Sequence, residues 1–253
     1  MIKSRFQNKT IVITGAGTGM GKAVSLRLAD EGAQLVLIGR RLAPLQELAE
    51  QIDTAGGTAV AFSCDITRED ALAATIGKVR ERFGRLDGLF ANAGVLSEFK
   101  PLAETDMNQL GTVIDTNLVG TFLTIKHCLP LLKNGAIAIN ASWTAQAVMP
   151  GAGAYAATKG ALLTLMKTLA VEQGQRGIRV NAISPGIILT PMADAVLSVE
   201  LSAKLAAHAA LKRNGVPEDV SGTVAWLLSS DSAYVTGQEI VIDGGYTIGG
   251  LRL

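Results

Sequence analysis

The stretch that decides the fold is residues 10–21, which read Thr-Ile-Val-Ile-Thr-Gly-Ala-Gly-Thr-Gly-Met-Gly. Its first part, Thr10–Thr14, is apolar and β-branched and predicts a buried strand. The four glycines within 15–21 predict a tight turn, and a helical pattern follows from about residue 20. A strand, a glycine-rich turn and a helix in this order bring backbone N–H groups to a helix N-terminus, where they can bind a pyrophosphate.

Short apolar runs alternate with helical patterns along the rest of the chain. The runs that predict further strands are Gln34–Ile38, Thr58–Ser63, Gly88–Ala91, Ala136–Ala141, Arg179–Ser184 and Glu239–Ile242. The segments with a helical pattern lie near 20–31, 42–55, 68–83, 104–116, 118–132, 152–174 and 217–229. This alternation predicts right-handed crossovers and a parallel sheet with helices on both faces. We therefore predict an α/β fold with one domain over residues 1–253, a Rossmann-type doubly wound sheet of about seven strands.

The composition excludes several classes of protein. The 253 residues are 48% apolar and carry a net charge of +1, with the basic residues scattered along the chain. This balance gives no electrostatic footprint for a nucleic acid, and no apolar stretch approaches the ~18 residues of a membrane span. Cys64 and Cys128 lack the spacing of a metal site, and the short polar N-terminus is unlike a secretory signal. We expect a cytoplasmic protein without a catalytic metal and with neither nucleic acid nor membrane as a partner.

Three side chains predict chemistry at a carbonyl oxygen. Tyr155 and Lys159 share one face of the helix near 152–174, and Ser142 follows the strand Ala136–Ala141. A free tyrosine has a pKa of about 10, and we expect the lysine ammonium to lower the pKa of Tyr155 toward the range that suits acid–base catalysis. The serine hydroxyl can bind the same oxygen and stabilise negative charge. Each residue alone commonly has a plain structural role, but together with the dinucleotide turn they predict hydride transfer.

The end of the second predicted strand indicates the cofactor. An acidic residue there would bind the 2′-hydroxyl of the adenosine ribose. The chain instead has Arg40 and Arg41 after Gly39, and a guanidinium can bind a 2′-phosphate in a bidentate manner. We therefore predict NADP(H) rather than NAD(H). The alternative is that the two arginines only cover the surface at a helix start.

Two motifs resemble those of the short-chain dehydrogenase/reductase family: Thr-Gly-x-x-x-Gly-x-Gly over 14–21 and Tyr-x-x-x-Lys over 155–159. The resemblance implies that Tyr155 protonates the substrate oxygen as hydride arrives from the nicotinamide. It implies that Lys159 tunes the tyrosine and binds the nicotinamide ribose. It also implies a fourth catalytic residue, Asn117, whose side chain helps to hold a water that relays protons to the lysine.

The resemblance covers about Lys9 to Gly245 and implies further contacts with the cofactor. Asp65, at the end of the third predicted strand, would meet the adenine amino group. Ile188 and Thr190 would contact the nicotinamide carboxamide. The full expected cofactor set is Gly15, Thr18, Gly19, Met20, Gly21, Arg40, Arg41, Asp65, Ile66, Asn92, Ala93, Gly94, Tyr155, Lys159, Pro185, Gly186, Ile188 and Thr190.

The segment at about 187–213 breaks the alternation of strands and helices. We expect it to form a lid over the substrate, because it follows the carboxyl end of a strand; plain packing is the alternative. The apolar side chains expected around the nicotinamide are Leu96, Trp143, Met149, Ile187, Leu189 and Met192. Buried sugar hydroxyls would need polar partners, so we predict an uncharged, partly apolar ketone or the corresponding secondary alcohol. Of the two histidines, His208 lies in this segment, and His127 is expected to be a packed core residue.

Other functions are open on the same fold. A 3-oxoacyl-[acyl-carrier-protein] reductase should show a basic patch for its acidic carrier. The residues that could form a thin patch are Lys126, Lys133, Lys167 and Arg176. A non-catalytic NADP-binding sensor or scaffold would not need all four catalytic residues, and a sugar epimerase or dehydratase usually has a longer C-terminal domain. The resemblance also implies a homotetramer, packed through the helices near 104–132 and 152–174 and through the last helix and strand.

Overall fold

The computed structural model describes residues 4–249, and these residues form one parallel seven-stranded sheet in the order β3-β2-β1-β4-β5-β6-β7. The strands are β1 Thr10–Thr14, β2 Gln34–Gly39, β3 Thr58–Ser63, β4 Leu86–Ala91, β5 Leu132–Asn140, β6 Arg179–Pro185 and β7 Glu239–Ile242. The chain starts in the middle of the sheet, moves outward to β3, and returns past β1 to β4. This reversal places the switch point of a doubly wound sheet beside β1, so the predicted fold class is confirmed.

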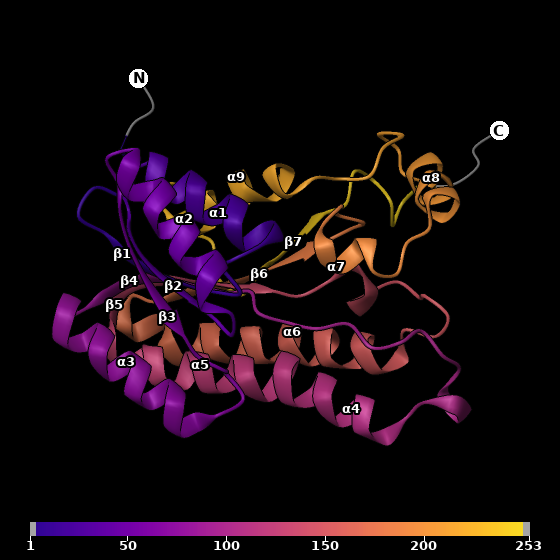
Figure 1. The fold of residues 1–253 in the computed structure, drawn as a ribbon, viewed down its shortest axis with the longest axis horizontal. Helices are drawn as coiled ribbons and strands as arrows, with labels where there is room; N and C mark the ends of the chain where they lie inside the picture. The colour runs from indigo at the N-terminus through magenta and orange to yellow at the C-terminus, as the bar shows by residue number, and fades with distance from the viewer. Residues whose placement is uncertain (1–3, 250–253) are drawn as a thin grey trace.

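Helices cover both faces of the sheet (Figure 1). On one face lie α1 Gly19–Asp30, α2 Leu42–Thr54 and α9 Pro217–Leu228. On the other lie α3 Glu69–Phe83, α4 Met107–Val113, α5 Gly120–Cys128 and α6 Gly153–Gln173. Along β1, Ile11 and Ile13 pack into the core under α1 and α9, while Val12 packs into the core under α3 and α6. Two buried faces explain why this strand is apolar throughout rather than alternating.

The helices expected near 104–116 and 118–132 form one continuous rod. A π-helical turn, Ile114–Val119, joins α4 directly to α5. Asn117 therefore lies inside a helix and not between two helices, which corrects the sequence prediction. Single π turns often occur at functional sites, because the extra residue redirects side chains and carbonyls.

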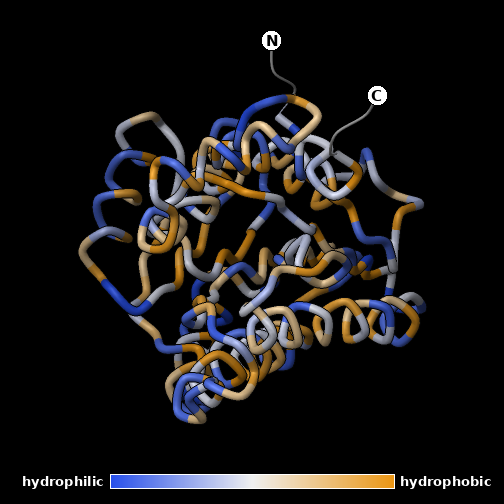
Figure 2. The backbone as a smooth tube through the Cα atoms, turned by 90° about the vertical axis from the view of Figure 1, so that its right-hand side faces the viewer, coloured by the Kyte–Doolittle hydropathy of each residue, from blue (hydrophilic) through white to orange (hydrophobic). Residues whose placement is uncertain are grey.

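The segment 187–213 contains two short helices, α7 Pro191–Asp194 and α8 Val199–His208, beyond the carboxyl edge of the sheet (Figure 1). Neither helix has a fully buried residue. Figure 2 looks onto this edge and shows hydrophilic and hydrophobic residues alternating along the outer helices, as amphipathic helices require. Among residues 4–249, no helix has both the length and the apolar character that crossing a membrane would demand.

Candidate active site

The glycine-rich turn between β1 and α1 folds tightly onto the start of the helix. Gly15 and Gly19 have φ angles of +65° and +54°, which favour glycine. A Cβ atom at Gly21 would lie 2.2 Å from the carbonyl oxygen of Gly15. The first turn of α1 has no acidic residue, so its free N–H groups face no competing carboxylate. This cradle fits a pyrophosphate group.

Asn92, after β4, fixes the shape of this turn. Its Nδ2 donates to the carbonyl oxygens of Thr14, at 2.9 Å, and Gly15, at 3.3 Å. Its Oδ1 accepts from Asn140 Nδ2 at 2.9 Å, which ties the ends of β1, β4 and β5 together. The sequence analysis missed Asn140, because a polar residue at a strand end carries no distinctive spacing.

Tyr155, Lys159 and Ser142 meet at the carboxyl end of β5. The first two lie in the first two turns of α6, and Ser142 follows the strand directly. Lys159 Nζ donates to the carbonyl oxygen of Asn140 at 2.7 Å and lies 5.5 Å from the centre of the Tyr155 ring. Ser142 Oγ accepts hydrogen bonds from Thr144 N at 3.2 Å and from Thr144 Oγ1 at 2.9 Å, and it lines the same cavity as Tyr155. The serine and tyrosine oxygens can therefore bind one substrate oxygen together.

Asn117 connects this group to the loop after β4. Its Oδ1 accepts from Val95 N at 2.8 Å, and its Nδ2 donates to Val95 O at 3.0 Å and to Thr158 Oγ1 at 3.3 Å. A Cβ atom at Gly94 would lie 3.1 Å from Asn117 Oδ1 and 3.6 Å from Lys159 Nζ, so the amide and the ammonium flank the same glycine. Asn117 is fully buried and does not line the cavity described next.

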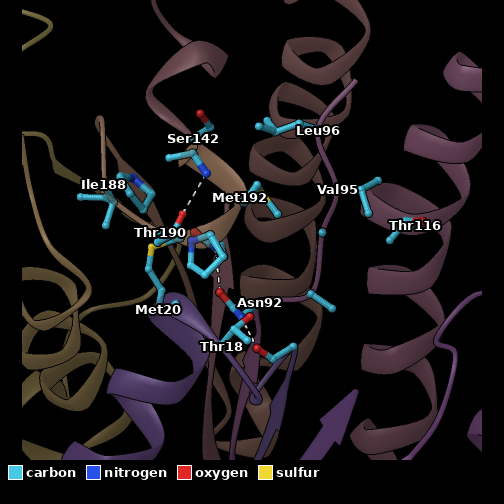
Figure 3. A pocket seen from close by; sticks show the side chains of 18 of the residues that line it. Thr18, Met20, Asn92, Val95, Leu96, Thr116, Ser142, Ile188, Thr190 and Met192 are labelled. Atoms are coloured by element: carbon cyan, nitrogen blue, oxygen red, sulfur yellow. Dashed lines mark hydrogen bonds between the residues drawn. The ribbon is translucent and has the colours of Figure 1, made fainter. Parts of the chain in front are cut away.

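A cavity of about 590 Å³ joins the glycine turn to the catalytic group. Figure 3 shows Thr18, Met20 and Asn92 toward one end and Ser142 and Leu96 toward the other. Every residue of the expected cofactor set lines it except Gly21, which lies beneath the turn. All the expected substrate residues line it except Leu189. The sequence analysis missed the apolar lining residues Phe99, Val196 and Leu197, which lie in irregular loops without a periodic pattern.

Leu189 was predicted to lie near the nicotinamide, but it does not line the cavity. Its backbone N–H donates to Gly215 O at 2.9 Å, and its side chain is 39% exposed. The neighbouring Ile188 forms a bridge with Gly215, and Ile187 and Ile188 both line the cavity.

Comparison with known proteins identifies the family. The family model described as Enoyl-(Acyl carrier protein) reductase matches residues 15–247. The chain belongs to the short-chain dehydrogenase/reductase family. Its relatives include cyclohexanol dehydrogenase of Acinetobacter sp. (strain SE19), which is 33% identical over 98% of both chains. Glucose 1-dehydrogenase of Gluconobacter oxydans (strain 621H) is 34% identical, over 98% of this chain and 95% of that protein. The crystal structure of levodione reductase superposes with a TM-score of 0.92 at 32% identity, covering 96% of this chain and 99% of that one.

Membership of the short-chain dehydrogenase/reductase family makes the chain an oxidoreductase with a nicotinamide cofactor. The named relatives act on chemically different substrates, so identity near one third does not decide the substrate. The substrate class must therefore be inferred from the residues that line the cavity.

Burial changes the pKa of two candidate catalytic side chains, Tyr155 and Lys159. It raises the pKa of Tyr155 to about 12, a rise that the hydrogen bond with Ser142 opposes, and it lowers the pKa of Lys159 to about 8. The expectation that the lysine lowers the pKa of the tyrosine is therefore wrong for this structure. Burial disfavours the charged form of each group, and the lysine amine is directed to the Asn140 carbonyl. Tyr155 is thus a protonated phenol at neutral pH.

The low pKa of Lys159 should make the stability of the protein depend on pH. Between the folded value of about 8 and the reference value of 10.5, the unfolded chain binds a proton that the folded chain lacks. The free energy of unfolding should therefore rise with pH across this window. Below about pH 8 the burial of Lys159 destabilises the fold by its full amount. Urea titrations give the free energy of unfolding of the wild type and of Lys159→Met. Relative to Lys159→Met, the wild type should gain about 2 kcal/mol in this free energy between pH 7 and pH 10. An equal difference at both pH values would contradict the assignment.

The end of the cavity next to β2 contains two arginines and a fixed carboxylate. Arg40 and Arg41 follow β2, line the cavity and are exposed. Asp65 Oδ1 accepts from Thr67 N at 3.0 Å and from Thr67 Oγ1 at 2.8 Å. These hydrogen bonds, with smaller effects from the charges of Arg40 and Arg68, hold the pKa of Asp65 below its usual value.

The histidines lie outside the catalytic group. His127 is not a core residue as predicted: it is half-buried on the surface of α5, and its Nε2 lies 3.1 Å from Glu69 Oε1. His208 ends α8. Across the described residues, no group of three or more His, Cys, Asp or Glu side chains could hold a metal ion.

Proposed function

We propose that this protein is an NADP(H)-dependent oxidoreductase that transfers a hydride between the nicotinamide and an uncharged, partly apolar ketone or the corresponding secondary alcohol. The observation that supports this most strongly is the single cavity that holds the glycine turn at one end and Ser142, Tyr155 and Lys159 at the other. The bound nicotinamide would supply or accept the hydride.

The protein's own groups would move the proton. In the direction of reduction, Ser142 and Tyr155 bind the carbonyl oxygen, and the Tyr155 phenol donates its proton to that oxygen as negative charge develops there. Lys159 then supports the return of a proton to the tyrosine, because an amine with a pKa of about 8 exchanges protons readily near neutral pH. Asn117 holds Val95 and Thr158 in place beside this group.

We assign NADP(H) as the preferred cofactor because Arg40 and Arg41 are placed to bind a 2′-phosphate. We expect kcat/KM for NADPH to exceed that for NADH about tenfold or more. Replacing both arginines by serine should remove most of this preference, mainly through KM for NADPH. Arg80→Ser is the control. It removes a positive charge from the exposed face of α3, far from the cavity, and should leave the cofactor preference unchanged. A wild-type enzyme that prefers NADH would contradict the assignment.

A 3-oxoacyl-[acyl-carrier-protein] reductase is the second candidate, and the family model's description of an acyl carrier protein substrate favours it. The possible basic patch is, however, partly used for structure. Lys126 pairs with Glu69 at 2.7 Å, and Arg176 donates to the carbonyl oxygens of Leu129 and Leu132. The ion pair makes Lys126 less available to an acidic carrier and the hydrogen bonds direct Arg176 to the backbone, so the patch presented by Lys133 and Lys167 is thin. Assays with acetoacetyl carrier protein and with simple ketones separate the two functions.

We also propose a cytoplasmic homotetramer. Phe122 and Val119 on the rod of α4 and α5 are 51% and 40% exposed, and Val171 on α6 is 83% exposed. Side chains of this size support the packing of these helices against a second copy. Sedimentation equilibrium would test the assembly, and a monomer would reject it.

A further inference from the structure

An aromatic contact links the residue after the catalytic serine to the C-terminal turn and to α8. The ring of Trp143 meets the ring of Tyr246 edge-on, with centroids 4.8 Å apart. Tyr246 meets His208, the last residue of α8, in the same manner at 4.9 Å. Segments distant in the sequence thus join in one row of three rings.

The C-terminal turn is itself rigid. Both carboxylate oxygens of Asp243 accept hydrogen bonds, from Gly245 N at 2.8 Å and from Thr247 N and Oγ1 at 2.8 and 2.7 Å. A Cβ atom at Gly186 would lie 2.7 Å from Asp243 Cα, so the turn is seated directly against the cofactor-binding loop. The backbone that carries Tyr246 is therefore held in place by these contacts.

The same turn holds the end of α8. Leu211 N donates to Gly244 O at 3.0 Å, and a Cβ atom at Gly245 would lie 2.6 Å from the Cβ of Ala210. Figure 1 shows α8 beside the C-terminal end of the described chain. Since α8 has no fully buried residue, these contacts just beyond its last residue help to hold it, together with the hydrogen bonds from Asn214 Nδ2 to Ser202 O and Oγ at 3.0 and 2.8 Å.

Trp143 forms part of the cavity wall and cannot move away from it easily. Its residue is only 7% exposed, and Tyr246 abuts its ring. The neighbouring lining residues are apolar: Leu96, Phe99, Met149, Met192 and Leu197. A fixed aromatic wall favours a rigid ring as its partner, because a ring offers a large apolar area and loses little conformational freedom on binding.

We propose that Trp143 forms an aromatic subsite for the ring of a cyclic or aryl ketone, and that Tyr246, which lies behind Trp143 and does not line the cavity, is a positioning residue that fixes Trp143 and couples it to α8. This inference rests on the proposed function and specifies its substrate class.

The kinetic test compares 2-tetralone, a bicyclic ketone, with 2-butanone, a small acyclic one. The wild type should prefer 2-tetralone, and Tyr246→Ala should lower the ratio of the two kcat/KM values about tenfold, mainly through KM for 2-tetralone. Tyr246→Phe keeps the ring and should keep the ratio within about twofold. Tyr234→Ala is the matched control, because Tyr234 is fully exposed. Tyr246→Leu replaces the ring without leaving a cavity, should Tyr246→Ala not fold.

Fluorescence provides a readout that does not need turnover. The chain has two tryptophans, so Trp226→Phe leaves the emission of Trp143 alone. In that background Tyr246→Ala should shift the emission to longer wavelength and increase acrylamide quenching about twofold. In the presence of NADPH, 2-tetralone should protect Trp143 from the quencher, whereas 2-butanone should not.

The outcomes separate this inference from the proposed function. Absence of turnover with every ketone would reject the proposed function, while protection of Trp143 by 2-tetralone would still support the subsite. Equal loss of kcat/KM for both ketones in Tyr246→Ala, or a Trp143 emission that the substitution leaves unchanged, would overturn the inference.

Discussion

Tyr155→Phe should lower kcat for ketone reduction by a factor of about 10³ and leave the Kd for NADPH within about twofold of the wild type. The substitution removes the phenol hydroxyl and keeps the ring, whose centre lies 5.5 Å from Lys159 Nζ. The proton donor is lost, whereas the shape of the cavity is retained. Single-turnover oxidation of NADPH measures the chemical step, and quenching of NADPH fluorescence measures binding.

Tyr234→Phe is the matched control for this experiment, because it removes a hydroxyl from a fully exposed ring. It should change neither kcat nor Kd. A Tyr155→Phe protein with a near-normal rate would show that the phenol donates no proton and would reject the mechanism. A wild-type protein that binds NADPH but reduces no substrate would instead favour a sensor or scaffold.

Gly21→Ala should weaken NADPH binding about 100-fold or more, a loss of roughly 3 kcal/mol. The new Cβ would lie 2.2 Å from Gly15 O and 2.9 Å from Asn92 Nδ2, so the clash is with backbone and with the amide that holds the turn. A flexible side chain cannot relieve it. The N–H groups of the cradle should therefore move away from the pyrophosphate. Titration of NADPH fluorescence measures the effect.

Gly77→Ala in the middle of α3 is the control, since a Cβ there meets nothing within 4 Å. It should leave NADPH binding unchanged and stabilise the fold by up to about 1 kcal/mol, the helix preference of alanine over glycine. If Gly21→Ala bound NADPH as tightly as Gly77→Ala, the turn would not be the pyrophosphate site.

The sheet could be predicted because its strands are buried on both faces. Seven apolar runs separated by helical patterns leave few alternatives, and the predicted runs coincide with β1 to β7 apart from their ends. The sequence predicted a strand from Ala136, because Lys133, Asn134 and Gly135 interrupt the apolar run. In the structure β5 begins at Leu132. Leu132 pairs with Leu86 of β4, and the register shifts before the pair of Gly88 and Ala136, an irregularity that no local pattern encodes.

Those residues of the candidate site that belong to a sequence motif could be predicted. Properties that depend on burial in the folded protein could not. The glycine turn and the spacing of Tyr155 and Lys159 are visible in the sequence, and the structure brings them to one cavity. The direction of the pKa shift of Tyr155 was not predictable, because it depends on how deeply each group is buried and where the lysine amine points. The contact of Trp143 with Tyr246 was likewise invisible, since the two are a hundred residues apart.

The π-helical turn has a consequence for protein engineering. Ile114–Val119 is in effect an ordinary helix with one surplus residue, so removing Val119 could be absorbed by closing the turn into regular α-helix. Such a shortened rod would carry every other residue of the site on an intact scaffold. Because closing the turn keeps the helices on either side in register, the change would fall inside the turn itself and would shift the Asn117 amide away from the backbone of Val95. A one-codon deletion should therefore separate the Asn117 amide from Val95 without replacing a side chain that lines the cavity.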